Sequence, residues 1–352
     1  MGVIFQFAAP TRIIFENGSF KKLPDLIAEL GSIVFIVTGQ RTISAIQLSK
    51  WLNEINFETE IFSVGTEPTT HDIEKGVRLA RKTACNIVVG IGGGSVVDAA
   101  KAIAALATNK GCLIDYLEII GKGRKLENDP LPYIAVPTTA GTGAEVTKNA
   151  VIKSEVKKVK VSLRSEKMFP AIAVIDPALT LTMPPELTAF TGVDALTHLL
   201  ETFVSCQSNQ FIDMLCREGM KRISSTLETA FFNGENLQAR ENMAMASMLG
   251  GLALANVKLG AVHGFAGPMG GMFTIPHGAV CACLLPAVME INIRVIKENN
   301  RGTELVKYDE VARILTQNEN SIAEDGVVWV KEMVKKLKIP SLSYFHLSNN
   351  SF

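Results

Sequence analysis

The first half of the chain alternates short, wholly apolar runs with longer segments whose apolar residues recur every three or four positions. Runs that are apolar throughout predict strands buried on both faces, and their alternation with helices predicts a parallel sheet. We therefore expect an α/β domain over residues 1–180. Its predicted strands cover 32–39, 59–64, 86–94, 131–137 and 171–176, and its predicted helices cover 42–55, 71–84 and 95–109.

The pattern changes after Pro185, where apolar residues keep helical spacing and no further strand is evident. This spacing is typical of helices that bury one face. The helical segments cover 186–205, 211–232, 239–257, 284–300 and 327–338. We expect an all-helical second domain over residues 181–352, and a length of 352 residues also favours two domains.

Charge and composition narrow the class of partner. Lys plus Arg total 35 and Asp plus Glu total 35, so the formal net charge is zero and no basic field would hold nucleic acid or an anionic membrane. The N-terminus has no basic segment followed by a long apolar core, and no run of about 18 apolar residues predicts a membrane span. We expect a cytoplasmic protein with a small-molecule partner.

Six scattered cysteines form no C-x-x-C pair, which favours free, mostly buried thiols over a disulfide framework. Cys281 and Cys283 are the closest pair along the chain. Side chains at positions i and i+2 point apart on a helix or a strand, so this pair makes a poor chelate.

A glycine-rich turn, Gly90–Ser95, joins a predicted strand to a predicted helix. Glycines there would let a phosphate approach the backbone beside a helix N-terminus, although a plain tight turn is the alternative. Ser95 and Asp98 have the spacing of a capping box, which predicts that the helix begins there. The turn matches neither the usual dinucleotide fingerprint nor a P-loop.

A second polar turn, Pro137–Glu145, follows the predicted strand 131–137 and contains three threonines and two glycines. Ligands of parallel sheets bind at the carboxyl ends of strands, so the threonine hydroxyls are candidate ligand contacts. A structural turn closed by serine or threonine hydroxyls is the alternative.

A candidate metal site comes from two segments in the predicted helical domain. Asp194 and His198 lie four residues apart on one predicted helix and so share a face. His263 and His277 flank a glycine-rich stretch and could add two imidazoles. One carboxylate and three imidazoles suit a divalent iron or zinc ion, which could polarise a carbonyl or stabilise an alkoxide. Each of these residues could instead be structural.

Four stretches together resemble the iron-containing alcohol dehydrogenase family: 90–104, 132–147, 175–205 and 260–286. The likeness runs from about residue 5 to about 343, with the motifs in the family's order. It implies a Rossmann-like dinucleotide-binding domain, a helical metal domain and a site in the cleft between them. It also implies NAD(P)-linked interconversion of an alcohol and an aldehyde or ketone. We further expect a homodimer.

The resemblance assigns roles to individual residues. Asp194, His198, His263 and His277 resemble the ligands of a metal, Fe²⁺ in the first instance and Zn²⁺ as the alternative. The residues that resemble contacts of NAD or NADP are Gly92, Gly93, Gly94, Ser95, Asp98, Thr138, Thr139, Thr142, Lys160 and Leu179.

Three departures from the family pattern carry expectations of their own. Gly267 stands where members often have a second histidine, so proton handling is expected to differ. Gly39 and Arg41 stand where an acidic residue often follows the first strand, so NADP is expected to be accepted at least as well as NAD. The chain ends where members commonly continue, so terminal helices are expected to be missing.

Other reactions remain open on the same architecture. A metal-dependent cyclase like dehydroquinate synthase would need many basic residues, and 260–286 contains no Lys or Arg. A glycerol-dehydrogenase-like enzyme usually has fewer protein ligands. A catalytically weak scaffold that binds the cofactor is a third alternative.

Overall fold

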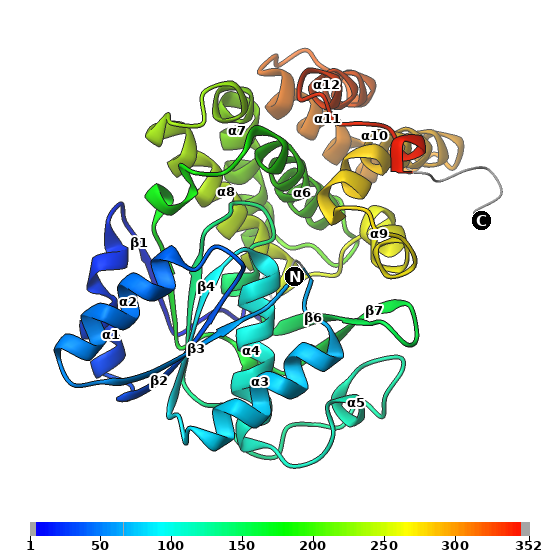
Figure 1. The fold of residues 1–352 in the computed structure, drawn as a ribbon. Coiled ribbons are helices and arrows are strands. Elements are labelled where there is room, and N and C mark those ends of the chain that lie inside the picture. Colours follow the sequence, from blue (N-terminus) through cyan, green and yellow to red (C-terminus); the bar gives the residue numbers. More distant parts are fainter. Residues whose placement is uncertain (1–4, 66, 346–352) are drawn as a thin grey trace. The chain divides into compact units, whose positions relative to one another are not determined.

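The computed structural model describes residues 5–65 and 67–345, and the chain divides into two compact units (Figure 1). The α/β unit comprises Ala9–Thr139 and Ala144–Thr180. The helical unit comprises Met1–Ala8, Ala140–Gly143 and Leu181–Phe352. The short segment 140–143 therefore belongs to the helical unit, although the chain on both sides of it belongs to the α/β unit.

The α/β unit is built on a six-stranded sheet, which confirms the predicted fold class. All of its strand pairs are parallel, in the order β1-β8-β5-β4-β2-β3. The strands are β1 (Arg12–Phe15), β2 (Ile33–Thr38), β3 (Glu58–Ser63), β4 (Ile87–Gly92), β5 (Tyr133–Pro137) and β8 (Ile172–Ile175). The edge strand β1 was not predicted from the sequence; its residues are exposed or only partly buried, whereas the equally short β8, which was predicted, is fully buried.

Helices cover both faces of this sheet. On β2, Val34 and Ile36 join the apolar cluster that contains α1 and α2, whereas Phe35 and Val37 join the cluster that contains α3 and α4. Successive strand residues point to opposite faces, so a strand buried on both sides must be apolar throughout. The helices are α1 (Leu23–Ala28), α2 (Ile43–Glu54), α3 (Thr70–Lys82), α4 (Gly94–Thr108) and α5 (Leu113–Tyr116), with 3-10 turns η1 (Ser19–Lys22), η2 (Ala144–Val146), η3 (Glu166–Met168) and η4 (Pro177–Thr180).

An antiparallel hairpin, β6 (Asn149–Ser154) with β7 (Val159–Arg164), was also missed by the sequence analysis. Its contacts show that the capping box predicted at the start of α4, from Ser95 to Asp98, is wrong. Gly93 is the N-cap of α4 and makes no side-chain cap, and the helix begins at Gly94. The Asp98 carboxylate instead accepts a hydrogen bond from Val151 N at 3.0 Å and lies 3.6 Å from Lys101 Nζ. The Asp98 side chain therefore bonds the hairpin and does not cap α4.

The helical unit contains no strand among its described residues, as expected. The central helix is α6, which packs against α7, α8 and α10. The sequence did not set α9 and α11 apart as separate helices. The helices are α6 (Pro185–Phe203), α7 (Gln210–Phe232), α8 (Leu237–Leu254), α9 (Ala261–Met272), α10 (His277–Glu298), α11 (Gly302–Thr316) and α12 (Ala323–Lys336), followed by the 3-10 turn η5 (Leu342–Phe345).

One helix bears on the expectation that the chain contains no membrane span. By length and composition α10 could cross a membrane, and it is the one helix in the described part of the chain that could. Its residues Ala279–Ala282 and Leu285 are buried inside the helical unit, as in the core helix of a folded domain.

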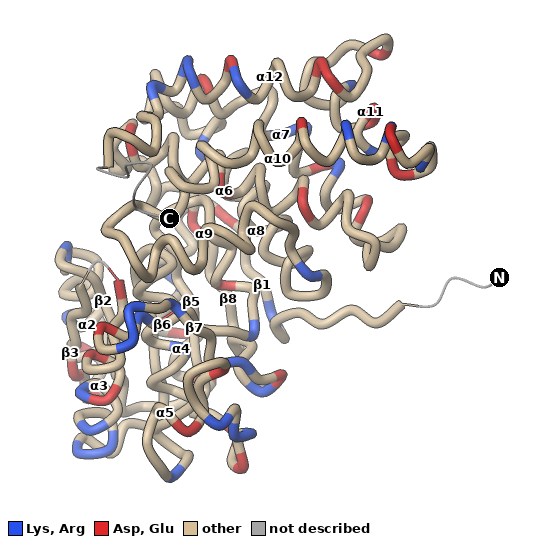
Figure 2. The backbone as a smooth tube through the Cα atoms, turned by 90° about the vertical axis from the view of Figure 1, so that its right-hand side faces the viewer, with Lys and Arg blue, Asp and Glu red and all other residues tan. Residues whose placement is uncertain are grey.

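Acidic and basic residues are interspersed along α3, α11 and α12, so these helices offer no surface of a single charge (Figure 2).

Candidate active site

Helix α6 places three polar side chains on one buried face. Asp194, His198 and Glu201 follow one another at intervals of four and three residues, which aligns side chains along one side of a helix. They are only 2%, 5% and 4% exposed, so water does not satisfy them. Polar side chains buried to this extent require partners from neighbouring helices or a bound ion.

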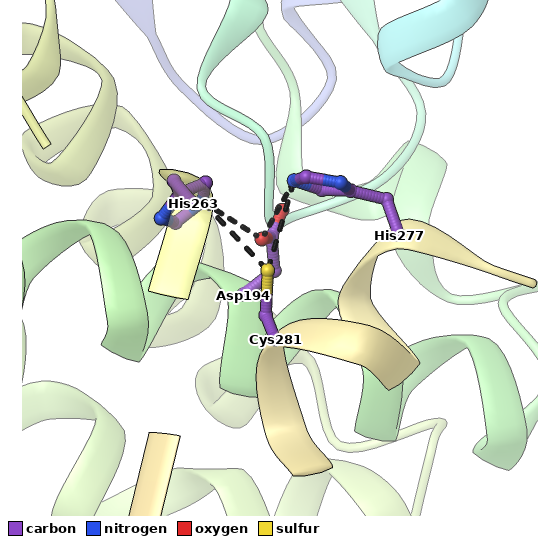
Figure 3. Close-up of side chains that lie close together, drawn as sticks. All are labelled: Asp194, His263, His277 and Cys281. Atoms are coloured by element: carbon purple, nitrogen blue, oxygen red, sulfur yellow. Dashed lines mark hydrogen bonds and ion pairs between the residues drawn. The ribbon is translucent and has the colours of Figure 1, made fainter. Parts of the chain in front are cut away.

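Two further helices bring ligand atoms to Asp194 (Figure 3). His263 lies in the first turn of α9, His277 is the first residue of α10, and Cys281 lies one turn further along α10. The Asp194 Oδ1 atom is 3.5 Å from His263 Nε2 and 3.6 Å from His277 Nε2. One ligand atom from each of these four residues lies within 4.8 Å of every other. The side chains therefore surround one point, as the ligands of a cation do.

Two buried atoms beside this cluster lack hydrogen bonds. Neither Asp194 Oδ1 nor His198 Nδ1 has a hydrogen-bond partner among residues 5–65 and 67–345. An unpaired buried oxygen or nitrogen costs free energy, so its presence in a folded core calls for an explanation. A divalent metal ion among these atoms would remove that cost.

The protonation states of this cluster are set by burial and by its own charges. Burial acts to raise the pKa of the Asp194 carboxyl, but the neighbouring imidazoles His198, His277 and His263 outweigh it and lower the pKa. Burial lowers the pKa of His198 to about 4, so that its ring is neutral at pH 7. An ionised carboxylate and a neutral imidazole are the forms that bind metals.

His263 differs from His198 because acidic groups surround it. Burial alone would lower its pKa, but Cys281, Asp194 and Glu201 raise it well above its usual value. In the absence of a metal these neighbours therefore favour the protonated ring, and a metal ion would compete with that proton.

Not all four of the residues predicted as metal ligands contribute an atom to this cluster. Asp194, His263 and His277 belong to the four-atom group, whereas His198 does not. The His198 ring stacks on the His263 ring, with centroids 4.5 Å apart and planes 20° apart. Cys281 was not predicted as a ligand, because its spacing from Cys283 was the only feature of the sequence that pointed to it.

Glu201 is a second residue that the sequence analysis missed. Its carboxylate accepts hydrogen bonds from Val262 N at 2.7 Å and lies 2.7 Å from His263 Nδ1. A carboxylate on one ring nitrogen fixes the orientation of an imidazole and leaves Nε2 for a metal. The spacing of Asp194, His198 and Glu201 on one helix face was the available signal.

The glycine turn lies at the carboxyl end of β4 in the α/β unit. Its neighbour is the end of β5, since Gly92 pairs with Pro137 and Thr138 N donates to Gly92 O at 2.9 Å. A Cβ on Gly92 would lie 2.5 Å from the Val96 side chain, so this position requires glycine. The first N–H groups of α4 have no acceptor within the helix and can bind an anion.

Gly93 and Thr139 lie together at this turn. A Cβ on Gly93 would be 3.4 Å from the Thr139 side chain, which is ordinary contact. The next threonine, Thr142, belongs to the helical unit. Around it, a Cβ on Gly141 would be 2.4 Å from Thr191 Cβ, and Gly143 adopts a φ of 59° close to Gly251. The polar turn is therefore divided between the two units.

The remaining predicted contacts have partners of their own. The Lys160 Nζ on β7 donates to Glu67 Oε1 at 2.5 Å. Leu179 lies in η4 and packs, partly buried, against the apolar cluster on the α1 and α2 side of the sheet. Gly267 lies one turn after His263 on α9, and no atom of the described residues lies within 4 Å of the Cβ that a side chain would add there. A larger residue would therefore fit at that position.

Comparisons with known proteins give one consistent result. The model of the iron-containing alcohol dehydrogenase family matches residues 10–177, and the C-terminal model of the Fe-containing alcohol dehydrogenase family matches residues 188–344. Alcohol dehydrogenase 4 of Saccharomyces cerevisiae is 36% identical over 313 residues, which cover 88% of this chain and 81% of the yeast protein.

Two solved structures extend this likeness to the fold. A 1,3-propanediol oxidoreductase has a TM-score of 0.89 and 31% identity, and the match covers 99% of this chain and 91% of the other. A sulfoacetaldehyde reductase from Bifidobacterium kashiwanohense, solved in complex with NAD⁺, has a TM-score of 0.86 and 25% identity. That match covers 99% of this chain and 90% of the other.

Proposed function

Because the chain belongs to the iron-containing alcohol dehydrogenase family, we propose that Asp194, His198, His263 and His277 hold the metal ion that this family's reaction requires. The chain is an NAD(P)-linked, metal-dependent alcohol oxidoreductase. The observation that carries the assignment of ligands is the buried Asp194 Oδ1, which has no hydrogen bond and faces two imidazole nitrogens at 3.5 and 3.6 Å.

The donor set fits a divalent iron or zinc ion, since carboxylate and imidazole ligands suit both. When bound, such an ion would supply a Lewis acid for the substrate oxygen, and the nicotinamide cofactor would supply or accept the hydride. The chain itself supplies charge and orientation. Asp194 supplies a negative charge in a buried site, and Glu201 holds the His263 ring so that Nε2 faces Asp194.

The proposed cofactor contacts fall into two kinds. We assign the pyrophosphate to the backbone of Gly92, Gly93, Gly94 and Ser95 at the start of α4, and further contacts to Thr138, Thr139, Thr142 and Leu179. Asp98 and Lys160 already bond Val151 N and Glu67. The proposed part of Asp98 is to hold β6 beside α4, and that of Lys160 is to hold β7 to the segment before α3, on the side of the ribose.

We propose that NADP is accepted at least as well as NAD. Support comes from the end of β2, where Thr38 pairs with Ile91 and the next residues are Gly39, Gln40 and Arg41. An acidic side chain there would repel a 2′-phosphate, whereas Arg41 would attract one.

Steady-state kinetics with both cofactors test this proposal. A preference for NAD above about tenfold, or about 1.4 kcal/mol, would contradict it. Arg41→Gln is the matched variant, because it should lower kcat/KM for NADP and leave kcat/KM for NAD unchanged. Equal losses with both cofactors would show that Arg41 does not contact the 2′-phosphate.

The substrate class is an alcohol and the corresponding aldehyde or ketone. The relatives named above include enzymes of a diol and of a sulfonated aldehyde, which differ in charge. The test is the change in NAD(P)H absorbance over a panel of neutral, cationic and anionic alcohols and aldehydes. No response from any member, with the metal bound, would contradict the proposal. The homodimer and the cytoplasmic location stay predictions from the sequence.

A further inference from the structure

Cys281 occupies a place in the metal cluster to which no role has been given. It lies four residues after His277 on α10, so both side chains project from the same helix face. The Cys281 Sγ atom is 3.7 Å from His277 Nε2 and 3.8 Å from His263 Nε2, and the residue is fully buried. Figure 3 shows the sulfur directed at the same point as the Asp194 carboxylate and the two rings.

Four of the six separations in this group are close to the edges of a tetrahedral metal site. Bonds of about 2.0 Å to nitrogen and oxygen and about 2.3 Å to sulfur place neighbouring ligand atoms of a zinc tetrahedron roughly 3.3–3.6 Å apart. The four separations given above run from 3.5 to 3.8 Å, and the remaining two, Asp194 to Cys281 and His263 to His277, are within 4.8 Å. Small side-chain movements would therefore bring all four atoms to one ion. His198 contributes no atom to this group.

An independent observation indicates that an ion belongs at this point. The Asp194 Oδ1 atom, on a residue 2% exposed, faces the centre of the group and accepts no hydrogen bond from the part of the chain that the structure describes. Cys283 provides the contrast, because its Sγ is 3.2 Å from Pro340 O, on the other side of α10. Of these two neighbouring thiols, only Cys281 is directed at the cluster.

We propose that Cys281 binds the metal as a thiolate, completing a set of Asp194, His263, His277 and Cys281 that favours zinc or cobalt over harder ions. This inference rests on the proposed metal site and changes one of its ligands, because it puts Cys281 in the position that the family resemblance gives to His198. On binding, the thiol proton passes to solvent and a sulfur–metal bond forms. Thiolate sulfur prefers borderline and soft ions, whereas a set completed by His198 contains only nitrogen and oxygen. Catalytic zinc can expand to five ligands, so the substrate oxygen still has a place.

Cobalt(II) is the probe, because thiolate-bound cobalt absorbs strongly in the near ultraviolet and cobalt bound only by nitrogen and oxygen does not. The chelator-treated full chain is titrated with cobalt(II), and bound metal is measured independently by elemental analysis. Wild type and the matched control Cys283→Ser should both show the sulfur band at one cobalt per chain. Cys281→Ser should bind cobalt without that band.

The outcomes separate this inference from the proposed metal site. One bound cobalt in the wild type without the sulfur band overturns the role of Cys281 and leaves the metal site standing. Persistence of the band in Cys281→Ser also overturns it. Failure to bind cobalt at all overturns both. The wild-type spectrum decides the question even if Cys281→Ser fails to fold.

Zinc affinity gives a second measurement. Loss of a residue that only supports a metal ligand costs about 10–100-fold in affinity, so loss of a direct ligand should cost at least tenfold. Competition with a chromophoric chelator should therefore show zinc binding at least tenfold weaker in Cys281→Ser than in Cys283→Ser. Equal zinc affinities in these two variants would contradict the proposal.

Discussion

The glycine turn of the α/β unit and the metal cluster of the helical unit are both candidate binding sites, but they are made of different parts of the chain. The turn is a backbone site, formed within six consecutive residues where β4 ends and α4 begins. The cluster is a side-chain site, formed by Asp194, His263, His277 and Cys281 from three helices. A backbone site depends on local geometry, whereas a side-chain site depends on how distant segments pack.

This difference predicts that the two sites respond to different substitutions. Removing one side chain should destroy the metal site and leave cofactor binding intact. Adding one methyl group at the glycine turn should weaken cofactor binding and leave metal binding intact. Substitutions that affect both sites equally would remove the distinction.

The largest effect is expected for His263→Ala. The change deletes a ligand nitrogen and leaves Asp194 and Glu201 buried with fewer partners. Metal affinity should fall by more than about 100-fold, beyond the cost of losing a supporting residue, and activity should fall to background. Elemental analysis after gel filtration measures the metal, and quenching of protein fluorescence by NADPH should give an unchanged Kd. Full activity in this variant would contradict the assignment.

A smaller effect is expected for Glu201→Gln. Glutamine keeps the volume but loses the charge that holds the His263 ring and Val262 N, so metal affinity should fall about 10–100-fold. Glu145 is the matched control, because it is equally buried and lies in the α/β unit. Glu145→Gln should leave metal affinity unchanged. If both variants lose metal equally, the effect comes from general destabilisation and not from the orientation of His263.

Gly93→Ala should have the smallest effect and should act on the cofactor alone. The φ of −71° suits alanine, and its Cβ would only touch Thr139, so Tm should change little. The added methyl group would lie where a phosphate approaches the backbone, so the Kd for NADP should rise about tenfold, or about 1.4 kcal/mol. Gly302→Ala is the control, since no atom lies near its Cβ. An unchanged Kd in Gly93→Ala would place the pyrophosphate elsewhere.

The same difference explains which features could be read from the sequence. The wholly apolar strands 86–94 and 131–137 and the glycines between strand and helix are local patterns, and they predicted the parallel sheet and the turn. The hairpin of β6 and β7 was missed because its residues alternate between buried and more exposed positions, unlike the continuous apolar runs that marked the strands of the parallel sheet. The cap of α4 was predicted wrongly because Asp98 bonds a residue 53 positions away.

In the metal cluster, the residue types indicated Asp194 and the histidines as ligands. Which of their atoms lie close together depends on the packing of the helices. Cys281 and Glu201 gave only weak local signals. Cys281 is one cysteine among six, and Glu201 is one of many acidic residues on helices. Their proximity to His263 follows from the packing of α6 against α10 and of α9 against α10, which no short pattern encodes.

The most direct test of the central claim is the alcohol-dependent reduction of NADP by protein from which the metal has been removed and then restored. The account predicts that the stripped protein still binds NADP but reduces none above background. One equivalent of Fe²⁺ or Zn²⁺ should restore turnover in the wild type and not in His263→Ala. Undiminished turnover by protein shown to contain no metal would contradict the account.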